Sequence, residues 1–408
     1  MMRSVAASRR EFLKGAAFAV AATALPASSL GAVSARAAAL HRDAYVFDAH
    51  VHALDREFYH GGNITDRVEV GQWDLPRARE GGVDAFFLSV FVPEEYYPGR
   101  YETKQALRRM DHALRQIHDA NAQLGLALNG ADLTRLEREG KVAAVLDIEG
   151  SYDLDGDPGV LRSMHALGLR SAQVSAHNWN QHYADACCST AQGGGLTSRG
   201  RDVVREMNRL GMVINVSHAA DTTIAQVIDA SERPVVATHH GLREVNDIPR
   251  NMPDDLLKKL VDRGGVIGFQ IGSEFAYPRE YAWLTAHRKK TFWDTTSIPE
   301  RTRGKSIYEI DELVAPTFPM LGAEVPDEVA MHMDDWVDVV DRAIRLVGED
   351  AVALGSDFDG GPTLARGMRD VRDLPMVTDA MLRRGYSEAR IRKFLGGNLR
   401  RVFGQATA

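Results

Sequence analysis

Cysteine is scarce in this chain. Only two of its 408 residues are cysteines, and these two, Cys187 and Cys188, are neighbours. Adjacent cysteines cannot form a framework of disulfides between distant segments. The sequence therefore excludes a disulfide-stapled fold, and stability must come from packing or from bound metal.

A hydrophobic run long enough to span a membrane is missing from the N-terminal region. The apolar stretch at residues 15–25 has about 11 residues, whereas a spanning helix needs about 20. It follows Ser8-Arg9-Arg10-Glu11-Phe12-Leu13-Lys14 and precedes small-residue sites at 35–37 and 37–39. This order is typical of a twin-arginine export signal. We predict that residues 1–37 are removed, leaving a periplasmic or secreted protein without a membrane span; a short amphipathic or anchoring helix is the alternative.

An excess of basic residues is absent too. The chain has a net charge of −7, and loss of residues 1–37, which carry +4, would leave −11. An acidic body argues against nucleic acid or an anionic membrane as the partner. The content of 44% hydrophobic and 26% charged residues is typical of a globular protein rather than a disordered one.

Short apolar or β-branched runs alternate with longer amphipathic stretches after residue 40, as in parallel strands joined by helices. Apolar residues at three- and four-residue spacing predict helices at 104–122, 198–210, 221–230 and 253–262. The predicted strands are residues 45–49, 84–92, 142–148, 171–175, 212–216, 234–238, 265–270 and 351–355. Eight strands in one domain, residues 38–408, favour an α/β fold of the (β/α)8 TIM barrel type over a doubly wound open sheet.

One long segment, residues 273–333, breaks this alternation. It follows the seventh strand and contains the basic run His287-Arg288-Lys289-Lys290 and several prolines. Barrel enzymes place their active sites on the face where this segment emerges. The insertion is therefore a candidate lid or homodimer contact, with surface decoration as the alternative. Residues 387–395 then predict a closing helix capped by Ser387.

Histidines and carboxylates follow six of the eight predicted strands. A barrel brings these strand ends to one rim, so residues spread over about 300 positions would meet in one cavity. Each residue alone has an ordinary explanation as a turn or helix cap. The set comprises His50 and His52 after the first strand, Glu149 after the third, His177 after the fourth, His218 after the fifth, His239 and His240 after the sixth, and Asp357 and Asp359 after the eighth.

Taken together, these residues predict a site for two metal ions. Neutral imidazoles and carboxylates are ligands of Zn²⁺, and a carboxylate can bridge two ions. His50 and His52 share one face of a strand, which suits the first ion. His218 and His239 would hold the second ion, with Glu149 between the two.

Such a centre is suited to hydrolysis. Two cations lower the pKa of a bridging water and polarise the carbonyl that the resulting hydroxide attacks. A base must take up the water's proton and return it to the leaving amine, and Asp357 is positioned for this role. The alternative for residues 355–360 is a turn in which both aspartates cap the backbone; we expect Asp359 to do so and Asp357 to be catalytic.

A series of short motifs runs from about residue 44 to residue 403, outside the 273–333 segment. They are Phe47-Asp48-Ala49-His50, Asp147-Ile148-Glu149-Gly150, Glu206-Met207-Asn208-Arg209-Leu210-Gly211-Met212 with Val216-Ser217-His218, Pro234-Val235-Val236 before His239, Arg250-Asn251 with Asp254-Asp255, and Gly355-Ser356-Asp357-Phe358-Asp359-Gly360. In this order and spacing the motifs resemble the membrane dipeptidase family, the renal dipeptidase-like M19 metallopeptidases of the amidohydrolase superfamily. The resemblance implies a barrel of the metal-dependent hydrolase type with two zinc ions per chain.

The resemblance also implies a role for each matching position. The zinc ligands would be His50, the residue two after it, Glu149 as the bridge, His218 and His239. His177 would contact the substrate carbonyl or the tetrahedral intermediate, Arg250 would pair with the substrate carboxylate, and Asp357 would move the proton. Together with the bridging Glu149, His177 and Asp357 would form the catalytic group.

His52 departs from the usual pattern of the family. Members usually have His-x-Asp at the first strand, whereas His-x-His, as here, is usual in the wider superfamily. The change removes one negative charge from the metal site, so the bridging water should be more acidic. In the tandem His239-His240, the separation of His239 from His218 is similar to that in the family, so the resemblance implies His239 as the ligand.

These observations lead to a functional hypothesis. We expect a zinc-dependent dipeptidase that cleaves dipeptides with a free C-terminal carboxylate, clamped by Arg250. The first alternative is another amidohydrolase-type reaction, on an N-acyl amino acid, a lactone or a cyclic amide. The second is an exported binding protein without turnover, which the loss of a metal ligand or of the acid would favour; none of these residues is missing.

Overall fold

The computed structural model describes residues 33–93, 96–97, 101–150, 157–175, 183–188, 194–287, 298–318 and 322–408. The predicted export signal up to residue 32 and the predicted site residue His177 lie outside these ranges. Within them, no helix combines the length and the apolar character that crossing a membrane requires.

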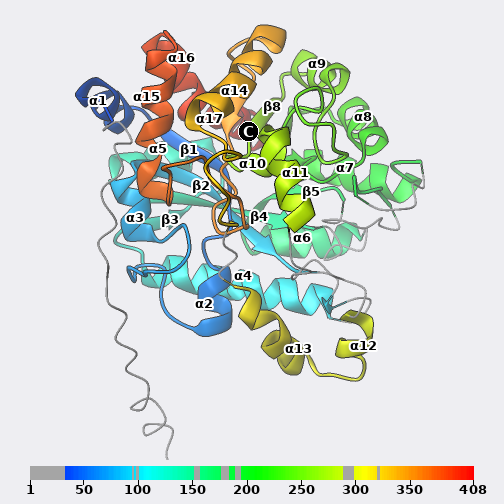
Figure 1. The fold of residues 1–408 in the computed structure, drawn as a ribbon. Helices are drawn as coiled ribbons and strands as arrows, with labels where there is room; N and C mark the ends of the chain where they lie inside the picture. The colour runs from blue at the N-terminus through cyan, green and yellow to red at the C-terminus, as the bar shows by residue number, and fades with distance from the viewer. Residues whose placement is uncertain are drawn as a thin grey trace, which may run out of the picture. The chain divides into compact units, whose positions relative to one another are not determined.

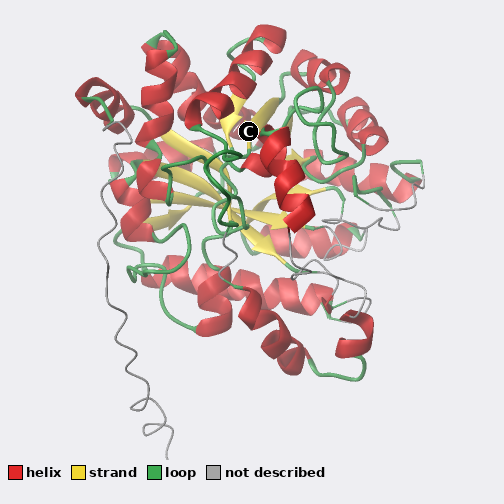
Figure 2. Ribbon diagram, viewed as in Figure 1, coloured by secondary structure: helices red, strands yellow, loops and turns green. Residues whose placement is uncertain are grey.

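Eight parallel strands form a ring. Its order is β1, β2, β4, β5, β6, β7, β8, β9. The ring closes where Val51, the last residue of β1, bridges Phe358 after β9, and the His52 N–H donates to the Phe358 carbonyl at 2.9 Å. The strands are β1 (Val46–Val51), β2 (Val83–Phe91), β4 (Val142–Glu149), β5 (Leu169–Gln173), β6 (Val213–Asn215), β7 (Val235–His240), β8 (Val266–Phe269) and β9 (Val352–Leu354). Each predicted strand overlaps one of these, and helices lie outside the ring (Figures 1 and 2). The predicted (β/α)8 TIM barrel is confirmed.

A further strand, β3 (Leu124–Leu126), is not among the predicted ones. It pairs only with the beginning of β4, where Leu124 lies beside Val142. Three residues with a central glycine are too few to show a period-two pattern. A Cβ at Gly125 would lie 2.2 Å from the Leu136 side chain, so the glycine allows α5 (Gly130–Arg138) to pack closely on this strand.

The four predicted helices are present. They are α4 (Glu102–Asp119), α7 (Ser198–Leu210), α8 (Asp221–Ala230) and α9 (Asp254–Asp262). Neighbouring residues determine both ends of α7. The Thr197 side chain accepts the Gly200 N–H at its start, and Gly211 adopts a left-handed φ of 71° after its end. Other helices around the ring are α1 (Ala35–Asp43), α2 (Asp55–His60), α3 (Leu75–Glu80), α6 (Pro158–Ala166), α14 (Met333–Val347) and α15 (Pro375–Arg383).

Helix α1 begins before the predicted end of the export signal. The Ser34 Oγ accepts the Ala37 N–H, which caps the helix. The N–H and hydroxyl of Ser34 also donate to Asp379 on α15, at 3.0 and 2.7 Å. Ala37 is fully buried. The predicted boundary after residue 37 therefore divides a packed helix.

The insertion at 273–333 carries short helices. They are α10 (Ser273–Ala276), α11 (Pro278–His287), α12 (Ile298–Thr302) and α13 (Ile307–Val314). Helix α13 lies beside α2 and α4 (Figure 1). Asp311 on α13 accepts a hydrogen bond from Tyr97 at 2.7 Å and pairs with Arg108 at 2.8 Å, and Phe318 stacks on Tyr59. The insertion is thus attached to helices of the barrel, while its roles as a lid or dimer contact stay predictions.

The closing helix is longer than predicted. Ser387 caps α16 (Glu388–Arg392) by accepting the Arg390 N–H, as expected. The chain continues through the π-helical turn η7 (Lys393–Gly397) into α17 (Asn398–Ala406) instead of ending at residue 395. A Cβ at Gly396 would lie 2.3 Å from the Tyr45 carbonyl, so this glycine permits close packing at the start of β1. The helix therefore covers the end of β1 opposite to the candidate site.

Candidate metal centre

The carboxyl ends of the strands bring five predicted ligands together. His50 lies in β1 and His52 follows it, Glu149 ends β4, His218 follows β6, and His239 lies in β7. All five side chains are buried. One group of possible ligand atoms comprises His50, His52 and Glu149 and another comprises Glu149, His218 and His239, with the atoms of each group within 4.8 Å of one another. The two groups share Glu149.

Glu149 lies between two pairs of histidines. Its Oε2 is 2.8 Å from His50 Nε2 and 2.9 Å from His52 Nε2. Its Oε1 is 3.2 Å from His218 Nε2 and 3.7 Å from His239 Nε2. Each carboxylate oxygen therefore has two imidazole nitrogens beside it. This donor set fits two cations that share one bridging carboxylate.

Burial and charge act against each other in this cluster. Burial alone would lower the pKa of His50, but Glu149 and Asp147 outweigh it and raise this pKa to about 9. Burial would raise the pKa of Glu149, but His50 and His52 outweigh it and keep that pKa well below its usual range. Burial lowers the pKa of His239 well below the ordinary value. The pKa directions favour a charged Glu149 and a protonated His50, so a cation that binds here competes with a proton on His50.

Three residues at the strand ends have an uncommon backbone conformation. His218, Asp357 and Asp359 are the only non-glycine residues of the described ranges with a positive φ, at 64°, 64° and 62°. His218 follows β6, and the two aspartates follow β9. Left-handed conformations are costly for such residues and cluster at functional sites. Their concentration here marks the same rim as the histidine cluster.

Two acidic residues that face the histidines were not identified from the sequence. Asp147 Oδ2 lies 3.4 Å from His50 Nδ1, and Asp55 Oδ2 lies 2.8 Å from His52 Nδ1. Asp147 is two residues before Glu149 in β4 and so shares its face. Asp55 follows His52 by three residues, at the start of α2. These short spacings were the available sequence signals.

Asp357 lies at the rim of the cluster. Its Oδ1 is 3.3 Å from His52 Nε2, and its Oδ2 accepts a hydrogen bond from Gln270 at 3.1 Å. Asp359 faces elsewhere, and its carboxylate accepts the backbone N–H of Gln72. Asp359 thus caps a backbone N–H, as expected, and the N–H belongs to a loop distant in the sequence.

Arg250 is buried next to the cluster. Its Nη2 donates to the His239 carbonyl at 2.7 Å, and its guanidinium lies 4.9 Å from the centre of the Phe275 ring. Its Nε and Nη1 have no hydrogen-bond partner among the described residues. Burial lowers the pKa of Arg250, yet an arginine stays protonated in proteins. A buried guanidinium with unpaired N–H groups is suited to an anionic ligand.

Two further sequence features lie beside these residues, the tandem His239-His240 and the pair Cys187-Cys188. Only the first of the tandem histidines, His239, faces Glu149, because successive strand residues point to opposite sides; His240 is buried on the other side. Cys187 and Cys188 are both free thiols. The Cys187 N–H donates to the His218 carbonyl at 2.7 Å, so the cysteine segment borders the cluster.

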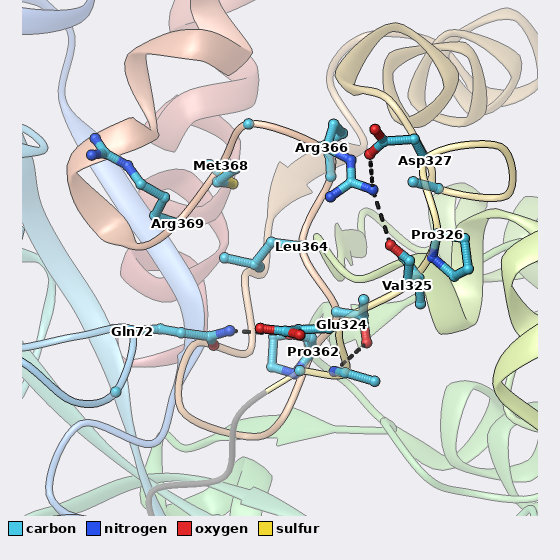
Figure 3. A pocket seen from close by; sticks show the side chains of 17 residues that line it. Gln72, Glu324, Val325, Pro326, Asp327, Pro362, Leu364, Arg366, Met368 and Arg369 are labelled. Carbon is cyan, nitrogen blue, oxygen red and sulfur yellow. Dashed lines mark hydrogen bonds and ion pairs between the residues drawn. The ribbon is translucent and has the colours of Figure 1, made fainter. Parts of the chain in front are cut away.

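A surface pocket of about 620 Å³ lies beside the chain that follows β9 (Figure 3). The insertion supplies one wall, where Arg366 donates to the Val325 carbonyl at 3.0 Å and pairs with Asp327. On another wall Gln72 donates to the Pro362 carbonyl at 3.0 Å. The pocket is lined by residues 71–72, 322–327, 330 and 362–369. None of the predicted ligands is among them, so this pocket is separate from the metal centre.

Comparisons with known proteins agree with one another. The family model "Membrane dipeptidase (Peptidase family M19)" matches residues 34–408, a span that includes the insertion. Dipeptidase verJ of Clonostachys rogersoniana is 30% identical over 345 residues, which are 82% of this chain and 76% of that protein. Dipeptidase aclJ of Aspergillus oryzae is 30% identical over 364 residues, 86% of this chain and 74% of that protein. The crystal structure of the probable dipeptidase PvdM from Pseudomonas aeruginosa matches with a TM-score of 0.75 at 26% identity, over 91% of this chain and 98% of that chain.

Proposed function

The chain belongs to the membrane dipeptidase family of metallopeptidases, peptidase family M19, and from this premise we propose that it hydrolyses dipeptides with the help of two zinc ions. As a metallo-dipeptidase it is a hydrolase that acts on peptide bonds. The observation that carries the proposal is the position of Glu149, which has two histidine nitrogens beside each carboxylate oxygen.

Two sets of side chains would hold the ions. His50 and His52 would hold one ion and His218 and His239 the other, with Glu149 shared between the two. Two zinc ions held there would supply an acidified water and polarise the scissile carbonyl. Since His52 is neutral where an aspartate would be charged, we propose that the centre is more electrophilic than one with His-x-Asp.

Asp357 would move the proton during hydrolysis. Its Oδ1 faces His52 and its Oδ2 is held by Gln270, so the carboxylate is fixed at the rim of the cluster. From there it would accept a proton from the attacking water and deliver it to the nitrogen of the leaving amino acid. His177, which lies outside the described residues, is proposed to contact the substrate carbonyl oxygen.

Arg250 would bind the C-terminal carboxylate of the dipeptide. Its unpaired Nε and Nη1 leave two N–H donors for a carboxylate, while Nη2 stays on the His239 carbonyl. Because this carbonyl belongs to a proposed metal ligand, the clamp would place the substrate next to the ions. A free C-terminal carboxylate is therefore part of the proposed substrate.

The proposal extends to location and assembly. The twin-arginine pattern in residues 1–37 supports export to the periplasm or beyond the cell. The insertion at 273–333, attached to α2 and α4, is proposed as a homodimer contact or a lid.

Metal analysis with a substrate panel tests this function. Purified protein should contain about two zinc ions per chain, and chelation should abolish hydrolysis until zinc is restored. The panel would compare L,L and L,D dipeptides, with free and amidated C-termini, with N-acyl amino acids, lactones and cyclic amides. One tightly bound ion with full activity would refute the two-ion centre. Faster hydrolysis of lactones, cyclic amides or N-acyl amino acids than of any dipeptide would refute the proposed substrate class.

A further inference from the structure

The ring of His52 is held from both sides. Its Nε2 lies 2.9 Å from Glu149 Oε2, in the cluster, and its Nδ1 lies 2.8 Å from Asp55 Oδ2, outside the cluster. His52 and Asp55 are 3% and 2% exposed, so water does not screen the contact. Phe91 packs edge-on against the ring, with centroids 5.3 Å apart. The ring therefore has one orientation, and Asp55 faces the nitrogen that points away from the cluster.

Asp55 is itself held in place by Arg109 on α4. The Asp55 Oδ1 accepts a hydrogen bond from Arg109 Nη1, and Arg109 Nη2 donates to the Tyr59 hydroxyl at 2.6 Å. The guanidinium also lies over the Phe58 and Tyr59 rings, 4.7 and 4.9 Å from their centres. Arg109 is only 4% exposed. The two carboxylate oxygens of Asp55 thus have different partners: Oδ2 faces His52, and Oδ1 accepts from Arg109.

The contact distinguishes His52 from two other histidines of the cluster. His50 Nδ1 is 3.4 Å from Asp147 Oδ2, beyond the usual length of a hydrogen bond between nitrogen and oxygen. His239 Nδ1 meets an uncharged partner, the Thr238 hydroxyl, at 3.0 Å. Of these three rings, His52 has the closest carboxylate on its outer nitrogen.

We propose that Asp55, held by Arg109, is a positioning residue that keeps the His52 proton on Nδ1 and leaves Nε2 free to bind a metal ion. A carboxylate behind a histidine ligand fixes its tautomer, orients its ring and raises its basicity, and loss of such a group lowers metal affinity by about 10- to 100-fold. The Asp55 carboxylate also places a negative charge on the outer side of the His52 ring, and His52 itself is a neutral ligand of the proposed centre. The inference rests on the proposed function, in which His52 is a metal ligand.

Asp55→Asn tests the inference with a small change in shape. An amide has one acceptor oxygen for two donors, the His52 Nδ1–H and Arg109, so one of these two contacts must be lost. Zinc affinity, measured on metal-free protein by competition with a chelating dye, should fall about 10- to 100-fold for at least one ion. The metal-free variant should keep its circular dichroism spectrum. Unchanged affinity for both ions would overturn the inference.

Asp74→Asn is the matched control. Asp74 is equally buried, and it also binds an arginine, since its Oδ2 accepts from Arg77 Nε at 2.6 Å. Its Oδ1 caps α3 by accepting the Arg77 N–H at 2.8 Å, and none of its hydrogen bonds in the described ranges involves a predicted ligand. The control should lose thermal stability but keep its zinc affinity. An equal loss of affinity in the control would show a general effect of disrupting a buried ion pair and would overturn the inference.

A double-mutant cycle with His52→Asn separates the inference from the proposal beneath it. His52→Asn should weaken zinc binding, and adding Asp55→Asn should then change it by less than about twofold, since coupled residues are not additive. If His52→Asn leaves zinc affinity unchanged, His52 is not a ligand and the proposed centre fails. If His52→Asn weakens zinc binding and Asp55→Asn then lowers the affinity further by the same factor as in the unmodified protein, only the positioning role fails.

A measurement on the unmodified sequence covers the case in which Asp55→Asn does not fold. Zinc-loaded protein with ¹⁵N-labelled histidine rings should show an exchange-protected imidazole N–H signal that disappears in His52→Asn. The nitrogen shift of this signal should identify it as Nδ1–H. Identification as Nε2–H would overturn the inference.

Discussion

Arg250→Met offers the most direct test of substrate recognition. Arg250 has three kinds of N–H group, of which one is used on the His239 carbonyl and two are unpaired in the described structure. A charge-assisted pair with a substrate carboxylate contributes about 1.5 to 3 kcal/mol. Since each 1.4 kcal/mol is a factor of ten, kcat/KM for dipeptides with a free carboxylate should fall by about 10- to 150-fold. Methionine keeps the unbranched apolar part of the side chain and removes the charged guanidinium.

The assay compares each dipeptide with its C-terminal amide. Amides should be poor substrates of the unmodified enzyme, and Arg250→Met should hardly change their kcat/KM. Zinc content should be measured in parallel, because Arg250 also touches the His239 carbonyl.

Arg243→Met is a control for the conformation of the same loop. Arg243 donates to the Pro249 and Asn251 carbonyls at 3.0 and 2.7 Å, on both sides of Arg250, and pairs with Asp221. Arg243→Met should lower the stability of the protein without changing the ratio of kcat/KM between free dipeptides and their amides. If Arg250→Met weakens free and amidated dipeptides equally, or if Arg243→Met reproduces its selectivity, the carboxylate clamp is refuted.

Three other predictions concern catalysis, pH and the N-terminus. Asp357→Asn should keep zinc and melting temperature while turnover falls about 10²- to 10⁴-fold; unchanged turnover would remove Asp357 from the mechanism. Burial lowers the pKa of His41 from 6.5 to about 4, so the unfolded chain binds the proton more readily than the folded protein. The free energy of unfolding should therefore have its full value above pH 6.5 and fall by up to about 3 kcal/mol as the pH is lowered toward 4. Urea unfolding should show a flatter pH dependence for His41→Gln, and an unaltered slope would contradict this assignment. A chain that starts at Ala38 lacks Ser34 and its bonds to Asp379, and should be less stable than one that starts at Val33 by about 1 to 2 kcal/mol; equal urea midpoints would show that the cap is irrelevant.

Local patterns in the sequence were enough for the barrel and for most of the strand-end cluster. The ends of α7 and α8 agree with the prediction because apolar periodicity, and for α7 also its caps, are contained within a few neighbouring residues. The predicted ligands meet at one rim because they follow parallel strands, whose ends the topology brings together.

Contacts between distant segments could not be read in this way. Arg109 reaches Asp55 across 54 positions, and His41 reaches Thr378 across 337. Such pairs leave no periodic trace, because each partner looks like an ordinary helix residue in its own neighbourhood. The closing helix was cut short for a related reason: Gly396 and Gly397 read as a helix end, whereas the absence of a side chain at Gly396 is needed for contact with Tyr45.

The position of Glu149 has a consequence for how the enzyme would acquire its metal. One carboxylate faces both histidine pairs, so the first cation to arrive offsets the negative charge that lies between the two pairs. The second cation then meets a site without that attraction and with a positive neighbour, and loading should proceed in two well-separated steps. When zinc is scarce, chains with a single ion would accumulate. The active fraction of the enzyme would then follow the zinc supply more steeply than the amount of protein.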